Sequence, residues 1–172
     1  HNKFRGVDKA WELSMDAFDI LNEVGVDFLV QMSVSDMNYK EIPEVVEFTE
    51  KIGAIAFNLY FLVCTGRGQG NTDISNAAYE EALKMLYEQQ MKYKGKLMIN
   101  SKCAPQYKRV VYENDPDSVY TRTYSGGCPA ATHYSRISPE GNLPPCPFIE
   151  ESVGNLKSRS FKDLWENAPL MI

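Results

Sequence analysis

The sequence predicts an α/β fold of parallel strands and helices, followed by an irregular region that contains a cysteine hairpin. Two largely apolar segments, 26–34 and 54–63, are separated by a segment with helical periodicity, which is typical of a βαβ unit. A long helical segment and a third short strand follow. After about residue 101 the alternation ends, and residues 101–159 hold three of the four cysteines and most of the prolines.

The N-terminal elements are predicted from their periodicity and end signals. Residues 8–24 should form a helix, because apolar side chains recur at helical spacing and a glycine follows as a stop. Apolar and other residues alternate over 26–34, as in a strand with two different faces. The next helix, 40–52, is expected to have Asn38 as its N-cap with Glu41 three residues further on.

The central elements point to a buried parallel sheet. Segment 54–63 is apolar almost throughout, as expected for a strand buried on both faces. A glycine-rich loop then leads to a helix over 75–94, and residues 96–100 form a possible third strand. Two or three parallel strands are too few to bury their own faces and edges, so we expect part of a larger α/β sheet or barrel.

We expect two domains, residues 1–100 and residues 101–172. The second should end in a helix from about Ser160, where Ser160 and Asp163 form a variant of the capping box. Both ends of the chain are abrupt, and we therefore expect a fragment of a longer protein.

Composition excludes several classes of function. The 172 residues carry a net charge of −5 without a dense Lys/Arg stripe, which argues against nucleic acid or an anionic membrane as partner. No apolar run reaches the roughly 18 residues that span a bilayer, and the first residues, HNKFRG, do not have the pattern of a signal peptide. We expect a cytoplasmic protein whose cysteines are reduced thiols or metal ligands.

Polar side chains at the carboxyl ends of the predicted strands are candidates for ligand binding, because parallel α/β folds bind ligands there. Gln31, Ser33 and Asn58 lie on strands, where buried polar groups need a partner. They could bind a ligand or simply bond one another and the backbone. The glycine-rich loop offers backbone N–H groups and the Arg67 guanidinium, which suit a carboxylate or phosphate.

The cysteines form a second candidate site. Residues 134–138 read as a short strand and 139–142 as a turn, so a hairpin could bring Cys128 and Cys146 together. Thiolates bind zinc and iron–sulfur clusters, but these usually take four protein ligands. Cys103 could be a third ligand. From spacing alone, two or three unconnected thiols are the favoured interpretation. The motifs H-E-x-x-H and G-x-S-x-G are absent.

Several segments together resemble the second half of a radical S-adenosylmethionine enzyme with a SPASM-type C-terminal extension. The nearest likeness is to the subgroup that modifies tetrapyrroles in the alternative-heme and denitrification-heme pathways, often labelled coenzyme PQQ synthesis proteins. The spacing Cys128-x12-Gly141-x4-Cys146 fits the first half of the SPASM signature. The matching segments are HNKFRG (1–6), GAIAFNLYFLVCTGRG (53–68), KCAPQYKRVVYE (102–113), GCPAATHYSRISPEGNLPPCPF (127–148) and GNLKSRSFKDLWENAP (154–169).

The resemblance implies an architecture and two sites. Residues 1–100 would be the later units of a partial (β/α) barrel, and residues 101–172 the first part of a SPASM-like region. Cys128 and Cys146 would be ligands of an auxiliary 4Fe-4S cluster, with Cys103 as a further candidate. The residues that would line the cavity for S-adenosylmethionine and substrate are Gln31, Ser33, Asn38, Asn58 and Arg67.

The resemblance also implies the chemistry of a longer parent protein. A 5′-deoxyadenosyl radical, formed by reductive cleavage of S-adenosylmethionine, would abstract hydrogen from a tetrapyrrole during heme biosynthesis. A ferredoxin or flavodoxin would supply the electron. This chain lacks the C-x3-C-x2-C motif and the second half of the SPASM signature. We expect it to be inactive and to bind no cofactor alone. The alternatives are a peptide-modifying enzyme, as in PQQ or sulfatase maturation, and a non-enzymatic zinc or thiol binding module.

Overall fold

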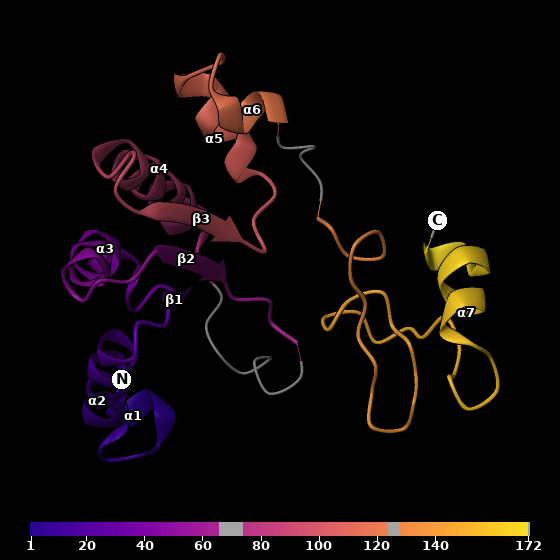
Figure 1. Ribbon diagram of the computed structural model, residues 1–172. Helices are drawn as coiled ribbons and strands as arrows, with labels where there is room; N and C mark the ends of the chain where they lie inside the picture. The colour runs from indigo at the N-terminus through magenta and orange to yellow at the C-terminus, as the bar shows by residue number, and fades with distance from the viewer. Residues whose placement is uncertain (66–73, 124–127, 172) are drawn as a thin grey trace. The chain divides into compact units, whose positions relative to one another are not determined.

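The computed structural model describes residues 1–65, 74–123 and 128–171, which form two compact units (Figure 1). The first unit contains residues 1–64 and 74–123, and the second contains residues 128–171. No helix among the described residues is both long and apolar enough to cross a bilayer.

A three-stranded parallel sheet organises the first unit. Its strands are β1 (Leu29–Val34), β2 (Ala56–Phe61) and β3 (Met98–Lys102), in the spatial order β1-β2-β3. The intervening helices are α3 (Ile42–Lys51) and α4 (Asn76–Lys92). The predicted α/β class with parallel strands is therefore confirmed.

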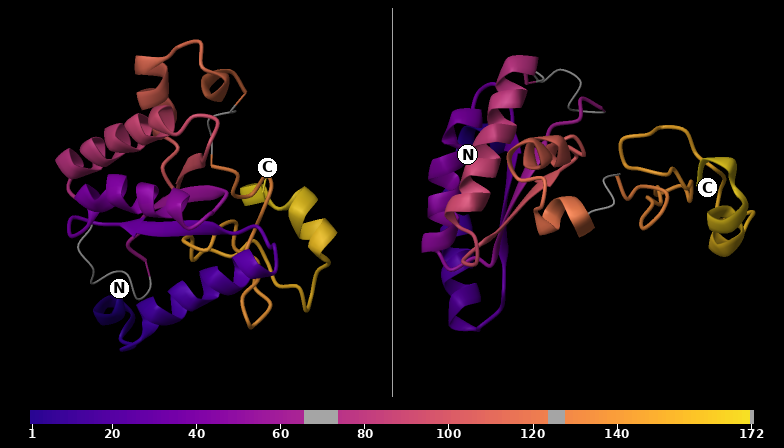
Figure 2. Two further views of the ribbon diagram at one scale, coloured as in Figure 1. Left: turned by 60° about the vertical axis from the view of Figure 1, so that its left-hand side comes forward. Right: turned by 90° about the horizontal axis from the view of Figure 1, so that it is seen from above.

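Helices α3 and α4 cover one face of the sheet (Figure 2). Met32, Phe57 and Leu59 point into the core that these helices close, and Phe57 and Leu59 are fully buried. Burying a side chain of this size contributes roughly 1.5–3 kcal/mol. Strand β2 supplies Phe57, Leu59 and Phe61 to this core. Ala56 and Asn58 between and beside them are also buried, so β2 is buried on both faces, as its nearly continuous apolar sequence predicted.

The expected N-cap at Asn38 is confirmed in its position but not in its side-chain hydrogen bond. A short 3-10 helix, η1 (Tyr39–Glu41), precedes α3, and the Asn38 side chain makes no cap hydrogen bond to it. Instead its Oδ1 accepts from Ser35 N at 2.8 Å and its Nδ2 donates to Ser33 O at 3.0 Å. Local backbone groups therefore compete with the helix for this side chain.

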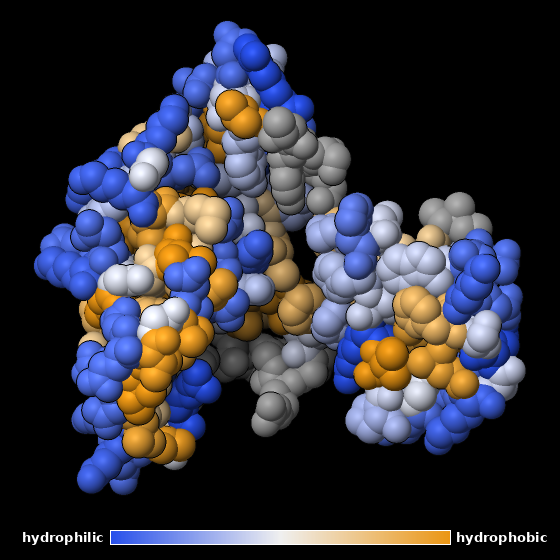
Figure 3. Space-filling view, in the orientation of Figure 1, coloured by the Kyte–Doolittle hydropathy of each residue, from blue (hydrophilic) through white to orange (hydrophobic). Residues whose placement is uncertain are grey.

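The N-terminal helices are α1 (Asn2–Arg5) and α2 (Ala10–Glu23). No residue of α2 is buried, and the helix is attached through aromatic contacts. The Trp11 ring lies 5.4 Å from that of Phe48, and the Phe18 ring stacks on that of Phe28 at 5.2 Å. The space-filling view shows apolar surface over this part of the unit (Figure 3).

The first unit extends past residue 100, where we expected a domain boundary. Helices α5 (Tyr107–Asn114) and α6 (Val119–Thr123) follow β3. Tyr107, Val110 and Val111 of α5 are buried in the same core as the sheet. These residues therefore pack with the α/β elements.

The second unit has a small core of its own. It contains α7 (Phe161–Asn167) and a final 3-10 helix, η3 (Pro169–Met171). As predicted, Ser160 caps α7, because its Oγ accepts from Asp163 N at 3.1 Å. The core residues are Leu143, Leu164, Ala168 and Met171.

Adjacent glutamines on α4 provide a test of the packing. Gln89 is buried and its Oε1 has no hydrogen-bond partner, whereas Gln90 donates to Ile99 O and accepts from Tyr107 Oη at 3.0 Å. An unpaired buried acceptor costs about 1–3 kcal/mol. We expect Gln89→Met to raise the free energy of unfolding by about 1 kcal/mol in urea titrations. The control, Gln90→Met, should lower the free energy of unfolding because it removes two hydrogen bonds. Equal losses in both variants would contradict the conclusion that Gln89 Oε1 is an unpaired acceptor.

Gly154 tests the packing of the second unit. Its φ is +155°, and a Cβ there would clash with Cδ2 of Leu164. We expect Gly154→Ala to lower the free energy of unfolding by about 1–3 kcal/mol through overpacking. Leu164→Val removes the clashing atom, so Gly154→Ala should cost less in that background. The same cost in both backgrounds, measured by chemical denaturation, would rule out the clash as the cause.

Candidate functional site

A row of polar side chains crosses the face of the sheet opposite α3 and α4. Gln31 of β1 lies level with Asn58 of β2, which lies level with Asn100 of β3. Because side chains alternate between faces along a strand, these three residues share one face. Two residues further along each strand, on the same face, a second polar row consists of Ser33, Tyr60 and Lys102.

Two residues of the first row are hydrogen bonded to each other. Asn100 Nδ2 donates to Asn58 Oδ1 at 3.1 Å, and Asn58 is only 6% exposed. Asn58 therefore has a polar partner within the sheet, but that partner is Asn100, whereas the partners expected from the sequence were Gln31, Ser33 and the backbone. Gln31 and Ser33 are exposed, and their side chains are accessible to a ligand on this face.

The other residues expected at this site divide into two cases. Asn38 fastens the loop after β1 through Ser33 and Ser35, as described above. Arg67 lies outside the described residues, so its role in ligand binding stays a prediction. Asn100 and Lys102 were missed. Continuing the register from β2 to β3 would have found them, because Asn100 is level with Asn58.

The second candidate site is a hairpin built on a tight turn after Cys128. Ala131 has a φ of +65°, which is unusual for a residue with a Cβ. His133 N donates to Pro129 O at 2.9 Å, and Ala131 N donates to Tyr134 O at 3.0 Å. This turn directs Tyr134 back towards Cys128.

The hairpin then closes around Gly141. Ser138 N donates to Asn142 O at 2.9 Å, and Arg136 N donates to Pro144 O at 3.2 Å. Gly141 has a φ of +92°, a conformation that favours glycine. The returning chain leads to Cys146, as the spacing of the two cysteines predicted.

The hydroxyl of Tyr134 lies between the two thiols. Its Oη is 3.9 Å from Cys128 Sγ and 3.8 Å from Cys146 Sγ, so the two sulfurs lie no further apart than the sum of these distances. Cys146 is buried and Cys128 is exposed. Loss of solvation and the hydrogen bonds to the thiols raise the pKa of Tyr134 well above its usual range, and the hydroxyl stays protonated.

The donor set at this hairpin fits part of a soft-metal site. Two thiols close to one phenol can supply two of the four ligands that zinc or a 4Fe-4S cluster usually takes. Among the described residues, no group of three or more His, Cys, Asp or Glu side chains is arranged to hold a metal ion. Cys103 belongs to the first unit, where it follows β3 with a φ of +57°.

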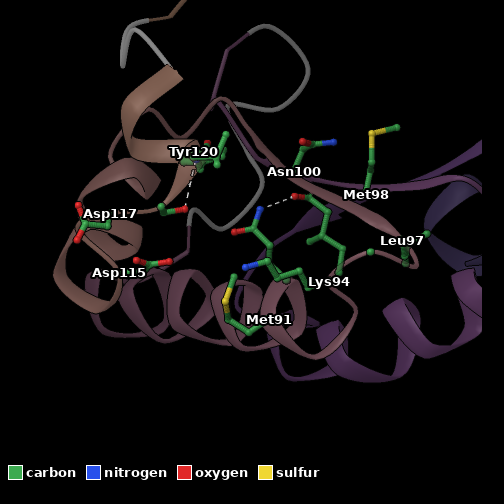
Figure 4. A pocket seen from close by; sticks show the side chains of 13 residues that line it. Met91, Lys94, Leu97, Met98, Asn100, Asp115, Asp117 and Tyr120 are labelled. Atoms are coloured by element: carbon green, nitrogen blue, oxygen red, sulfur yellow. Dashed lines mark hydrogen bonds between the residues drawn. The ribbon is translucent and has the colours of Figure 1, made fainter.

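A depression of about 390 Å³ also lies on the first unit, beside β3 (Figure 4). Met91, Lys94 and Met98 line one part of it, and Asp115 and Asp117 line another. Asp117 is paired with Arg122 at 2.8 Å. The lining is mixed and shows no set of convergent reactive groups, so we assign it no role.

Known proteins are similar to this chain over most of its length. Residues 128–171 match SPASM, an iron–sulfur cluster-binding domain. The chain is 32% identical to an AdoMet-dependent heme synthase of Methanosarcina barkeri, covering 98% of this chain and 50% of the relative. It is 22% identical to a pre-heme d1 synthase of Dinoroseobacter shibae, covering all of this chain and 46% of the relative. The chain thus spans about half the length of these curated relatives.

Solved structures share the fold. Crystal structures of Streptococcus suis SuiB align with a TM-score of 0.66 at 18% identity. The structure bound to S-adenosylmethionine covers 92% of this chain and 37% of SuiB, and the one bound to the precursor peptide SuiA covers 96% and 39%.

Proposed function

We propose that this chain binds an auxiliary 4Fe-4S cluster and forms part of the substrate cavity of a radical S-adenosylmethionine enzyme. The enzymes that it resembles act in heme biosynthesis and carry a SPASM-type C-terminal region. The observation that carries the proposal is the hairpin that brings Cys128 and Cys146 to one hydroxyl inside the segment that matches SPASM. The chain contains no C-x3-C-x2-C motif, so the residues that cleave S-adenosylmethionine would lie outside these 172 residues.

Cys128 and Cys146 would hold the cluster through their thiolates, which are the usual protein ligands of iron–sulfur clusters. Cys103 stays a further candidate. When bound, the cluster would supply one-electron chemistry. Burial of Cys146 shields its side of the site from water, whereas the exposed Cys128 leaves the other side accessible.

The open face of the sheet would line the cavity for S-adenosylmethionine and substrate. Gln31 and Ser33 offer accessible amide and hydroxyl groups, and the pair Asn58–Asn100 presents a bonded amide row beside them. Asn38 would keep the loop after β1 in place, and Arg67 would bind a carboxylate or a phosphate.

A tetrapyrrole is the substrate that we favour. The similar proteins from Methanosarcina barkeri and Dinoroseobacter shibae are named as a heme synthase and a pre-heme d1 synthase. A ferredoxin or flavodoxin would serve as electron donor. A peptide substrate is the alternative, because SuiB is solved with a precursor peptide. Binding of a siroheme-derived tetrapyrrole or of a peptide by the full-length protein separates the two.

The cluster assignment predicts iron content. In the anaerobically purified full-length protein, Cys128→Ala and Cys146→Ala should each lower iron and sulfide by about one cluster, that is about four iron atoms per chain. Cys64→Ala is the control and should leave both unchanged. Unchanged iron and sulfide in both variants would remove these residues as ligands. Zinc in place of iron would favour the zinc or thiol binding module.

The cavity assignment predicts weaker cofactor binding. Gln31→Ala and Ser33→Ala in the full-length protein should each raise the Kd of S-adenosylmethionine up to about tenfold, the equivalent of one lost hydrogen bond. Both side chains are exposed, so the melting temperature should stay the same. Asp16→Asn on α2 is the control. An unchanged Kd in both variants, measured by calorimetry, would remove them from the cavity.

A further inference from the structure

We propose that the Tyr134 hydroxyl donates a hydrogen bond to the thiolates of Cys128 and Cys146 and thereby raises the reduction potential of the cluster that they hold. This inference rests on the proposed function, because it requires a cluster at these two cysteines. It adds a residue to the site that is not itself a ligand.

The hairpin places this hydroxyl between the two sulfurs. Tyr134 follows Cys128 by six residues and precedes Cys146 by twelve, yet its Oη lies 3.9 Å and 3.8 Å from the two Sγ atoms. A phenol carries one proton, so it donates to one sulfur at a time and can turn between them. The left-handed turn at Ala131 and the hydrogen bond from Ala131 N to Tyr134 O direct the residue there.

Packing does not account for the position of Tyr134. The side chain is 37% exposed and is not part of the core formed by Leu143, Leu164, Ala168 and Met171. Its described polar contacts are the two thiols. A phenylalanine could cover the same surface, so the hydroxyl is the group that needs an explanation.

Neighbouring hydroxyls in the hairpin are committed to other partners. Ser135 Oγ donates to Pro144 O at 2.8 Å. Thr132 Oγ1 donates to Pro129 O at 3.1 Å and contacts His133 Nδ1 at 2.9 Å. Among the described residues of this hairpin, Tyr134 is thus the hydroxyl that bridges both thiols.

The direction of the effect follows from charge. Hydrogen bonds to ionised acceptors are stronger than those between neutral groups, and hydrogen bonds to cluster sulfurs are among the factors that set reduction potentials. Adding an electron increases the negative charge on the ligand sulfurs. A donor at Tyr134 therefore stabilises the reduced cluster more than the oxidised one, and removing it should lower the potential.

The experiment uses the full-length protein with the cysteines of its C-x3-C-x2-C motif replaced by alanine, so that only auxiliary clusters remain. Tyr134→Phe removes the hydroxyl and keeps the ring. We expect unchanged iron and sulfide and a midpoint potential below that of the parent in an EPR-monitored redox titration. Tyr112→Phe is the matched control, because Tyr112 is 59% exposed on α5 in the first unit, and it should leave the potential unchanged.

A second variant tests the opposite direction. A 3-fluorotyrosine incorporated at position 134 is a stronger donor of the same shape, and it should raise the potential. An unchanged potential in Tyr134→Phe with full iron would overturn the proposal. Loss of the cluster in a folded Tyr134→Phe protein would also overturn it, by assigning the residue to cluster retention. If Cys128→Ala and Cys146→Ala leave iron unchanged, the proposed function itself has failed, which is a separate result.

Discussion

The first unit depends on one constraint. Side chains alternate between the two faces of each strand, and three parallel strands are paired in register, so the alternation is the same across the sheet. Side chains at alternate positions of β1 and β2 pack against α3 and α4, and Phe57 and Leu59 are fully buried there. The intervening positions therefore face away from the helices, and the register sets Gln31, Asn58 and Asn100 in one row. The core that stabilises the unit and the surface that we propose for ligand binding are consequences of the same pairing.

The second unit reaches its arrangement by a different means. Residues 128–146 contain no regular strand, and single hydrogen bonds and two positive-φ residues shape them. A left-handed conformation at Ala131 costs roughly 1–2 kcal/mol relative to a right-handed one. Such strain often occurs where a site must be held in a particular geometry. Here it turns the chain so that Tyr134 meets Cys128 and Cys146.

Much of the fold could be predicted because its signals are local, whereas the missed features depend on contacts distant in sequence. The three strands and their helices followed from periodicity, and the hairpin followed from the spacing of Cys128 and Cys146. Asn100 was missed because its partner Asn58 lies 42 positions earlier, and only strand register relates them. Asn38 stands at the predicted N-cap position, but its side chain makes no capping hydrogen bond because nearby backbone groups bind it. The position of Tyr134 beside the thiols depends on the left-handed turn at Ala131. Alanine in a sequence does not indicate such a turn.

The alternation along β1 and β2 also has a consequence for how such a chain can evolve. Substitutions at Gln31 or Ser33 change the chemistry of the open face without altering a side chain of the core, and substitutions at Met32 or Val34 do the reverse. Selection can therefore act on ligand preference and on folding through separate residues of one strand. A sheet of this kind can acquire a new specificity by single steps that each leave a folded protein.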